Sequence, residues 1–271
     1  MRPITELRNI LLLLLFFLAF VMGCANSTTK SSFSSSSGTT SSTSGLPPTD
    51  KTWVKTFDEE FDGTSVDTDV WNIDNNYTCG ASQGCLSSRW AANVSVNNNV
   101  LELTTKKEML IKDLPWTTGA ITTRFFSQEY GFFEAKIRYG AATGLNNAFW
   151  LYSVNKAGVE PFEIDINEGH YTANIQMTLH NLKASTQVQS IIAEPADLSG
   201  DYHVYAIEWN KDEIIWYFDG KQVWKTPNTC ANGQAGIHIS TAVLPSTGAV
   251  TDDLDGTSMK VQWVRVYSRT D

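Results

Sequence analysis

Three carboxyl groups fall within one six-residue segment, and no other arrangement in the sequence is better suited to chemistry. Glu163, Asp165 and Glu168 lie in the run 162–168, where apolar residues alternate with polar ones. This alternation is typical of a half-buried β-strand, because successive side chains on a strand point to opposite faces. Glu163 and Asp165 would therefore share one face, with the apolar residues on the other.

Glu168 does not fit that alternation, which would turn Asn167 to the acidic face and Glu168 to the apolar one. A β-bulge near Ile166 and Asn167 would absorb one residue and return Glu168 to the side of Glu163. We therefore expect a bulge at this position. The two glutamates would then act as if four residues apart, with Cα atoms about 13 Å apart and carboxyl groups about 5 Å apart.

Two carboxyl groups about 5 Å apart are typical of glycosidases that retain anomeric configuration. One carboxylate attacks the sugar and the other protonates the leaving oxygen. An amphipathic strand with a solvated acidic face would show the same alternation, and such strands are common. Against that interpretation, Lys156 is the only Lys or Arg between Asn155 and Lys183. The three acids therefore lack local counter-charges, and this cost in stability tends to persist at functional sites.

The segment 163–168 resembles the E-x-D-x-x-E signature of glycoside hydrolase family 16, in its bulge-containing branch of laminarinases, lichenase-like enzymes, agarases and carrageenases. The resemblance spans nearly all of residues 53–268. Further segments resemble the family in the expected order: 60–63 with 71–72, 118–123, 130–137, 148–151, 202–209, 215–220 and 264–267. The resemblance implies a hydrolase with Glu163 as nucleophile, Glu168 as acid/base and Asp165 as the residue that orients the two glutamates and tunes their protonation.

Short runs of β-branched and aromatic residues, separated by Gly, Asn and Asp, predict an all-β fold. No convincing amphipathic helix is present, and about a dozen strands argue for a two-sheet sandwich. Asp219-Gly220 predicts a tight hairpin. The predicted strands are 93–97, 100–105, 120–126, 132–139, 147–153, 175–181, 204–209, 214–218, 222–225, 236–240 and 259–267. The resemblance implies a β-jelly roll of the concanavalin A type, with a concave sheet that holds the substrate.

Flat aromatic side chains bind the apolar faces of sugar rings. Trp150 is the first candidate for a sugar platform, because the family places a Trp on the strand beside the catalytic one. Trp90 and Trp116 are further candidates, since both lie in segments rich in turn residues. For each of the three, packing in the core is the alternative. His180 falls on the next strand, where the family often has a His near the cleaved sugar, although a lone His in a strand can equally be structural.

The first 50 residues predict export and a tether. Basic residues precede an apolar run from Ile10 to Met22, which suits a signal peptide and is short for a membrane span. The run ends at Cys24 in a segment resembling a bacterial lipobox, so residues 1–23 would be removed and Cys24 lipidated. Residues 24–50 are rich in Ser, Thr and Gly and predict a flexible linker, followed by a catalytic domain at 51–271. We expect anchoring to a bacterial membrane, at the outer membrane or the cell surface.

Charge and cysteine content restrict the partners. Without residues 1–23, 18 Lys and Arg stand against 28 Asp and Glu, a net charge of −10. This argues against nucleic acid and anionic lipid, and mildly against heavily sulfated polysaccharides. We expect a monomer. Cys79, Cys85 and Cys230 remain for one disulfide in an oxidising compartment. Cys79–Cys85 is the preferred pair, and Cys230 bonded to either is the alternative.

We predict no cofactor. Asp253, Asp255 and Gly256 are similar to part of a calcium loop, but Thr251 and Gln262 stand where its first and last carboxylates belong, which favours a solvated acidic turn. The family often carries a structural calcium. Gln262 also occupies a position where a carboxylate is usual there, so calcium is not predicted.

The substrate implied first is a β-1,3- or mixed β-1,3-1,4-glucan, cleaved internally. Two departures from the laminarinase pattern favour a different cleft: Asn146-Asn147 replaces the usual Trp-Pro, and the loop at 86–90 lacks the usual asparagines. A β-galactan of the agar or porphyran kind is therefore the second interpretation. The third, from another functional class, is a lectin-like protein that binds carbohydrate without cleaving it.

Overall fold

The computed structural model describes residues 47–79, 84–171, 173–194 and 197–271, all within one compact unit, Ser42–Asp271. The predicted signal segment 1–23, Cys24 and nearly all of the predicted linker lie outside the described residues, and they stay predictions. Within the described ranges, no helix is long and apolar enough to cross a membrane.

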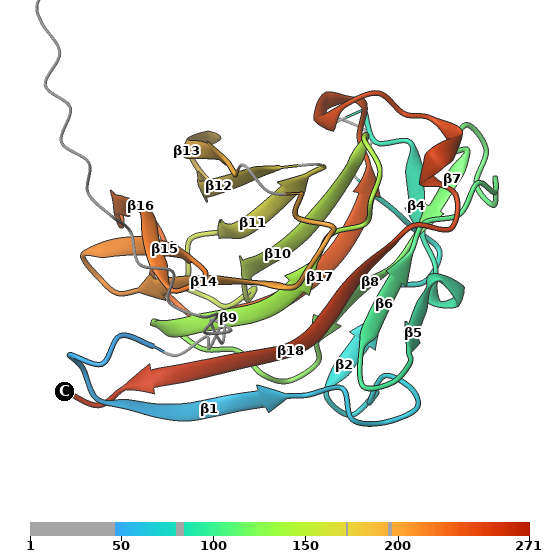
Figure 1. Cartoon of the computed structure of the whole chain (residues 1–271). Coiled ribbons are helices and arrows are strands. Elements are labelled where there is room, and N and C mark those ends of the chain that lie inside the picture. The colour runs from blue at the N-terminus through green and yellow to red at the C-terminus, as the bar shows by residue number, and fades with distance from the viewer. Residues whose placement is uncertain (1–46, 80–83, 172, 195–196) are drawn as a thin grey trace, which may run out of the picture. The chain divides into compact units, whose positions relative to one another are not determined.

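Two large antiparallel sheets form the unit, and a small third sheet lies beside them (Figure 1). The eight-stranded sheet has the order β16-β15-β14-β9-β18-β6-β5, with β1 paired to β18. Its strands are β1 (Trp53–Glu59), β5 (Val94–Val96), β6 (Leu101–Thr104), β9 (Gly131–Arg138), β14 (His203–Trp209), β15 (Glu213–Phe218), β16 (Lys221–Pro227) and β18 (Ser258–Arg269).

The seven-stranded sheet has the order β13-β12-β11-β10-β17-β8-β2 and carries the acidic segment on β11. Its strands are β2 (Trp71–Ile73), β8 (Ala120–Thr123), β10 (Leu145–Ser153), β11 (Phe162–His170), β12 (Asn174–Asn181), β13 (Thr186–Ala193) and β17 (Ala235–Val243). The small sheet joins β3 (Tyr77–Thr78), β4 (Ser87–Arg89) and β7 (Trp116–Thr118). The described helical turns are the short 3-10 turns Ala91–Asn93, Pro245–Thr247 and Asp252–Leu254.

The hydrophobic core fills the space between the two large sheets. Phe162, Ile164 and Ile166 of β11 are all buried in it. Trp209 of β14 meets the ring of Phe162 edge-on at 5.6 Å. Alternation along β11 therefore turns the apolar side chains toward the opposite sheet and leaves Glu163 and Asp165 on the outer face.

The strand prediction is confirmed for all eleven runs, each of which overlaps a strand of the structure. The hairpin at Asp219-Gly220 is also confirmed: both residues have positive φ, 47° and 74°, as a two-residue hairpin turn requires. The predicted runs did not include β1, β13 or the short strands β2, β3, β4 and β7. Strand β13 lies at the edge of its sheet and is mostly exposed, so its sequence lacks a buried apolar face.

The preferred disulfide is confirmed. Cys79 and Cys85 are bonded, and the bond closes the loop between β3 and β4. Cys230 is a buried free thiol in the described part of the chain.

Candidate active site

The predicted bulge is present in β11. Against β10, Asn167 pairs with Phe149, and Asp165 pairs with the very next residue, Trp150, so Ile166 is the extra residue. The register against β12 shifts at the same place, between Asp165 and Glu168. A bulge of this kind kinks the strand and re-aims the side chains that follow it.

The bulge restores Glu168 to the face of Glu163. On β12 their partners are Gln176 and His180, four positions apart, although the glutamates themselves are five apart. Glu163, Asp165 and Glu168 consequently line one cleft of about 460 Å³. The strands of the seven-stranded sheet provide its floor, and the small sheet contributes to one wall.

A buried amide network holds the bulge in place. The Asn167 side chain, fully buried, donates to the Asn147 carbonyl at 2.8 Å and accepts a hydrogen bond from the Tyr139 hydroxyl. Asn147 in turn donates to the Gly169 carbonyl at 3.1 Å and accepts from the Gly140 N–H at 2.8 Å. Gly169 is required here, because a Cβ atom on it would lie 2.1 Å from the Tyr139 ring. Sequence reasoning missed this network, whose only signal was the unusual Asn146-Asn147 pair.

Asp165 is held from both sides of its sheet. Its main-chain carbonyl accepts a hydrogen bond of 2.9 Å from the indole N–H of Trp216, which belongs to the opposite sheet. In the cleft, its carboxyl Oδ2 lies 2.9 Å from His180 Nε2, and the same nitrogen lies 3.9 Å from Glu163 Oε1. His180 therefore contacts the acidic residues directly, and sequence reasoning had left its role open.

Glu168 is held by two amides that sequence reasoning did not assign to the site. Asn146 Nδ2 donates to one carboxylate oxygen at 2.9 Å, and Gln176 Nε2 donates to the other at 2.9 Å. They come from β10 and β12, the strands on either side of β11. Glu168 thus accepts one hydrogen bond from each neighbouring strand, and this fixes the direction of its carboxyl group.

Burial and mutual repulsion raise the proton affinity of the other two acids. Burial, and then the negative charge of Asp165, raise the pKa of Glu163 to about 8. Burial, and then the charge of Glu168, raise the pKa of Asp165 well above its ordinary range. Within the described residues, none of the three acids pairs with Lys or Arg. These surroundings therefore favour keeping a proton on the Glu163–Asp165 pair near neutral pH.

Trp150 lines the cleft, where a sugar platform has to lie. Its ring stacks on His238 with centroids 4.2 Å apart, and its indole N–H donates to Ser240 Oγ at 3.1 Å. Burial, and then the charge of Arg89, lower the pKa of His238 to about 4, so this supporting ring is neutral. Tyr152, 39% exposed, stands beside Trp150 with ring centroids 6.0 Å apart. Sequence reasoning had not proposed Tyr152.

Two other predicted platforms do not face the cleft. Trp116 is only 3% exposed and packs against Leu145, Val243 and Leu254 in a secondary core. The Trp90 indole donates to Ser88 Oγ at 2.9 Å, and its side chain does not line the cleft. The Trp116 prediction was wrong, because a residue close to a turn can still be covered by strands that are distant in sequence. Trp90 is only partly buried, and its role stays a prediction.

One group of described residues has ligand atoms close enough to hold a metal ion. Glu163, Asp165 and His180 each place one such atom within 4.8 Å of the others. A divalent ion bound there would occupy the carboxylate oxygens that face the cleft. The acidic turn at Asp252 and Asp255 has other partners, because Lys107 donates to both carboxylates, from its ammonium group and its main-chain N–H respectively.

Comparison with known proteins agrees with this fold. The family model described as glycosyl hydrolases family 16 matches residues 81–265. The chain belongs to this family.

Similar proteins include several named for action on polysaccharides. Endo-1,3-1,4-β-glycanase ExsH of Rhizobium meliloti is 31% identical over 187 residues, which are 64% of this chain and 39% of that protein. β-Porphyranase B of Zobellia galactanivorans is 25% identical over 254 residues, 80% of this chain and 85% of that protein. The chain thus spans about two fifths of the length of ExsH.

Solved structures share the fold. The endo-β-1,3-glucanase of Pyrococcus furiosus superposes with a TM-score of 0.74 at 25% identity, over 83% of this chain and 98% of that one. The catalytic domain of an endo-1,3-β-glucanase (laminarinase) from Thermotoga petrophila gives a TM-score of 0.73 at 24% identity, over 82% of this chain and all of that one. Both likenesses identify the architecture as the two-sheet jelly-roll sandwich of the family.

Proposed function

We propose that this protein is a retaining endo-β-glycosidase that hydrolyses a β-1,3- or mixed β-1,3-1,4-glucan. The observation that carries the proposal is the bulge at Ile166, which brings Glu163 and Glu168 to one face on either side of Asp165. A carbohydrate-binding protein has no need of this paired arrangement, whereas hydrolysis with retention requires two carboxyl groups on the same substrate unit.

In the first step the Glu163 carboxylate attacks the anomeric carbon, and Glu168 gives its proton to the glycosidic oxygen of the leaving chain. The bond from carbon to that oxygen breaks as the bond to Glu163 forms. In the second step Glu168, now a carboxylate, takes a proton from water, and the water oxygen attacks the same carbon and releases Glu163. Two inversions leave the β-configuration unchanged.

Asp165 and His180 position the nucleophile and set its charge. Attack needs Glu163 ionised, and His180 Nε2 lies within reach of both Asp165 and Glu163. A proton held between Asp165 and His180 leaves the negative charge on Glu163, where the reaction needs it. The amides of Asn146 and Gln176 direct the Glu168 carboxyl group, and Trp150 offers a rigid face to a sugar ring.

A β-glucan is the first substrate because similar proteins are named glucan endo-1,3-β-glucosidase and endo-β-1,3-glucanase, and others are named endo-1,3-1,4-β-glycanase. A β-galactan is the second. It is supported by the similarity to β-porphyranase B over most of both chains and by Asn146 at a position where laminarinases usually have Trp. An arginine, Arg89, also lines the cleft, where it can donate to a substituted sugar.

We further propose that the protein is exported and lipid-anchored through Cys24 after loss of residues 1–23. The support is the sequence pattern of these residues. Radiolabelled palmitate should be incorporated into the full chain expressed in a bacterium, and Cys24→Ala should abolish labelling and release the protein from the membrane fraction. Labelling that persists in Cys24→Ala would contradict the anchor.

The experiment that tests the enzymatic function measures new reducing ends with laminarin, lichenan, agarose, carrageenan and galactan, with Glu163→Gln as the inactive control. We expect activity on laminarin or lichenan, and NMR should detect the β-anomer first. An initial α-anomer would exclude retention. Activity on a galactan alone would reassign the substrate, and binding without any new ends would favour the lectin.

A further inference from the structure

A second hollow lies on the eight-stranded sheet, which is not the sheet that carries the acidic cleft. We call it the groove. It has a volume of about 640 Å³ and is bounded by the start of β1, the turn before β9, the β14–β15 turn and the end of β18. We propose that the groove is a second, non-catalytic binding site for a neutral glycan chain of the β-glucan class. This inference rests on the proposed function for the choice of ligand.

The groove carries aromatic rings that are already held in place. The Trp53 indole donates to the Pro48 carbonyl at 3.0 Å, and its ring meets Phe132 edge-on at 5.9 Å. The Tyr130 hydroxyl donates to Asn232 Oδ1 at 3.0 Å, and its ring meets Trp209 edge-on at 5.3 Å. Rings fixed in this way lose little conformational freedom when a sugar packs against them.

The backbone at Tyr130 keeps that ring at the rim of the groove. Tyr130 has φ of 61°, in the left-handed region, and Gln128 Nε2 donates to its carbonyl at 2.8 Å. Gly131, with φ of 133°, lies so close to the Tyr267 carbonyl that a Cβ atom would be 2.3 Å away. The turn is therefore determined by its neighbours, and Tyr130 needs no rearrangement on binding.

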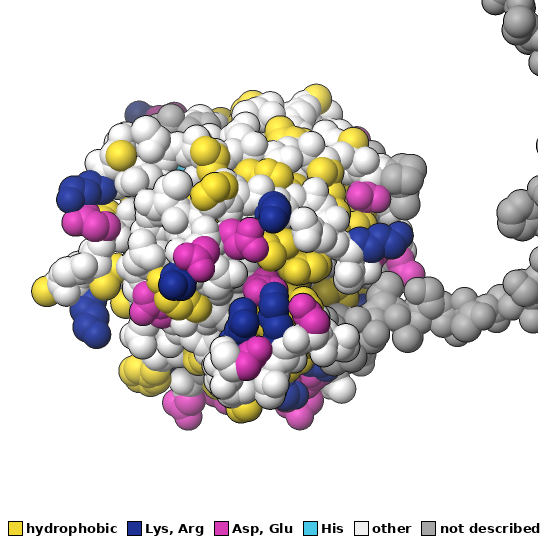
Figure 2. All heavy atoms as spheres, turned by 90° about the vertical axis from the view of Figure 1, so that its left-hand side faces the viewer, with side chains coloured by type: hydrophobic (Ala, Val, Ile, Leu, Met, Phe, Trp, Pro, Cys, Tyr) yellow, Lys and Arg dark blue, Asp and Glu magenta, His cyan; other side chains and the backbone are white. Residues whose placement is uncertain are grey.

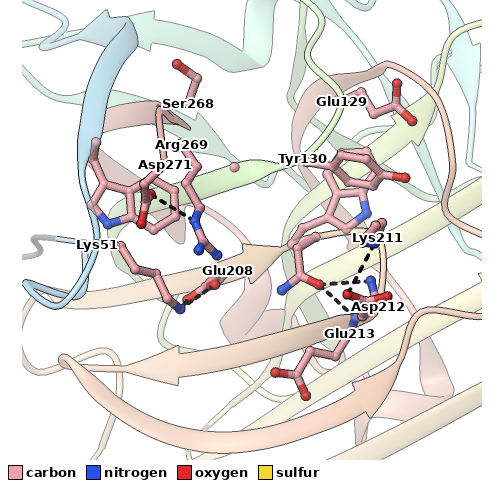
Figure 3. A pocket seen from close by; sticks show the side chains of 14 residues that line it. Lys51, Glu129, Tyr130, Glu208, Lys211, Asp212, Glu213, Ser268, Arg269 and Asp271 are labelled. Atoms are coloured by element: carbon pink, nitrogen blue, oxygen red, sulfur yellow. Dashed lines mark hydrogen bonds and ion pairs between the residues drawn. The ribbon is translucent and has the colours of Figure 1, made fainter.

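Four of the five carboxylates that line the groove are paired with a cation. Figure 3 shows Lys51 directed at Glu208 and Arg269 directed at Asp271. The nitrogen–oxygen distances of these ion pairs are 2.6 and 3.0 Å. Lys211 lies 4.0 Å from Asp212. On this face of the molecule, acidic and basic side chains are interspersed rather than gathered by sign (Figure 2). Such a surface offers many hydrogen-bond donors and acceptors. Its excess of carboxylates disfavours an anion and the ion pairs already occupy its cations, which suits a neutral polyhydroxyl ligand.

A chain held in the groove would leave the cleft free, because the two sites lie on different sheets. A protein that acts within long chains could hold one part of an insoluble polysaccharide while it cleaves another. The effective concentration of substrate at the cleft would rise without any change in the chemistry.

Calorimetric titration of the full chain with β-1,3-glucohexaose tests the proposal in the inactive Glu163→Gln background. We expect two sites per chain, and one site after Trp53→Ala or after Tyr130→Ala. The matched control is Phe125→Ala, an exposed aromatic residue that does not line the groove, and it should keep two sites. On insoluble β-1,3-glucan, each groove variant should raise the Kd about tenfold.

A single glycan-binding site in the Glu163→Gln chain and in every variant made from it would overturn the proposal. Two binding sites that persist in both Trp53→Ala and Tyr130→Ala would also overturn it. Circular dichroism checks that each variant is folded, and the two variants remove different rings on different elements. Sedimentation gives a further test: a dimer that Tyr130→Ala converts to a monomer would assign the groove to a second copy of the chain and overturn the glycan site. Failure of the proposed function is distinguishable, because it appears as absent hydrolysis by the unsubstituted chain, whereas groove occupancy is read in an inactive variant.

Discussion

The cleft and the groove are lined by the same acidic residue types, but their charges are arranged in opposite ways. Four of the five carboxylates that line the groove form ion pairs with Lys or Arg. In the cleft, His180 is the only basic side chain among the described residues that lies within 4.0 Å of Glu163 or Asp165, and Glu168 accepts from two neutral amides.

The difference shows that the partners of a buried carboxylate decide whether that carboxylate is reactive. Pairing a buried carboxylate satisfies it and makes it inert, whereas crowding carboxylates without cations raises their proton affinity and keeps them reactive. Glu208 and Asp165 are almost equally buried, at 1% and 3% exposure. They differ in partners, and on that basis we assign chemistry to one surface and only binding to the other.

The largest effect should come from removing the nucleophile. Glu163→Ala should lower kcat by about 10³-fold or more, because no other carboxylate can form the covalent intermediate at that position. Release of reducing ends measures the activity, and circular dichroism checks the fold. Near-normal activity in the folded variant would refute the assignment of Glu163 and with it the contrast between the two surfaces.

Breaking the buried ion pair of the groove should lower the stability of the fold. Lys51→Met leaves Glu208 buried without its cation, and we expect the free energy of unfolding to fall by about 2–4 kcal/mol. Urea unfolding measures it. The matched control is Lys211→Met, whose pair with Asp212 is exposed and should contribute less than about 0.5 kcal/mol. Equal losses in the two variants would mean that burial of the pair does not matter here.

Neutralising an acid of the cleft should raise the free energy of unfolding, whereas breaking the ion pair of the groove should lower it. The folded-state pKa of Glu163, about 8, lies above the ordinary 4.5. The stability that this group contributes is therefore complete below pH 4.5 and is lost as pH rises through 8. Glu163→Gln resembles the protonated form, so it should match the unsubstituted chain near pH 4.5 and exceed it by about 1–3 kcal/mol at pH 8. Calorimetry across this range checks the trend, and a difference independent of pH would contradict it.

The smallest effect should come from the amides that direct Glu168. Asn146→Ala or Gln176→Ala should each lower kcat by about tenfold, about 1.4 kcal/mol in the transition state, because each removes one hydrogen bond from that carboxyl group. KM should change less than about threefold, since neither amide donates to the platform at Trp150. A change in KM alone would show that these amides bind substrate rather than position Glu168.

Sequence reasoning succeeded where the signal is local. Alternation located β11, and the break in parity at Asn167 and Glu168 located the bulge, because a strand has a period of two and any exception is visible in the sequence. It failed at Trp116, whose neighbours are typical of a turn although its ring is buried. Local composition predicts where a chain turns, but it does not predict which side chains are buried by strands that are distant in sequence.

By itself the sequence determined the all-β class, the positions of most of the longer strands and the three acids, since these follow from periodicity and residue type within a few positions. Only the tertiary structure decided which donors hold those acids. Asn146 and Gln176 lie on neighbouring strands, and Trp216 reaches Asp165 from the opposite sheet. The groove likewise joins segments from Lys51 to Asp271. Contacts of this range depend on strand order and register, which arise when both sheets bury their apolar faces together.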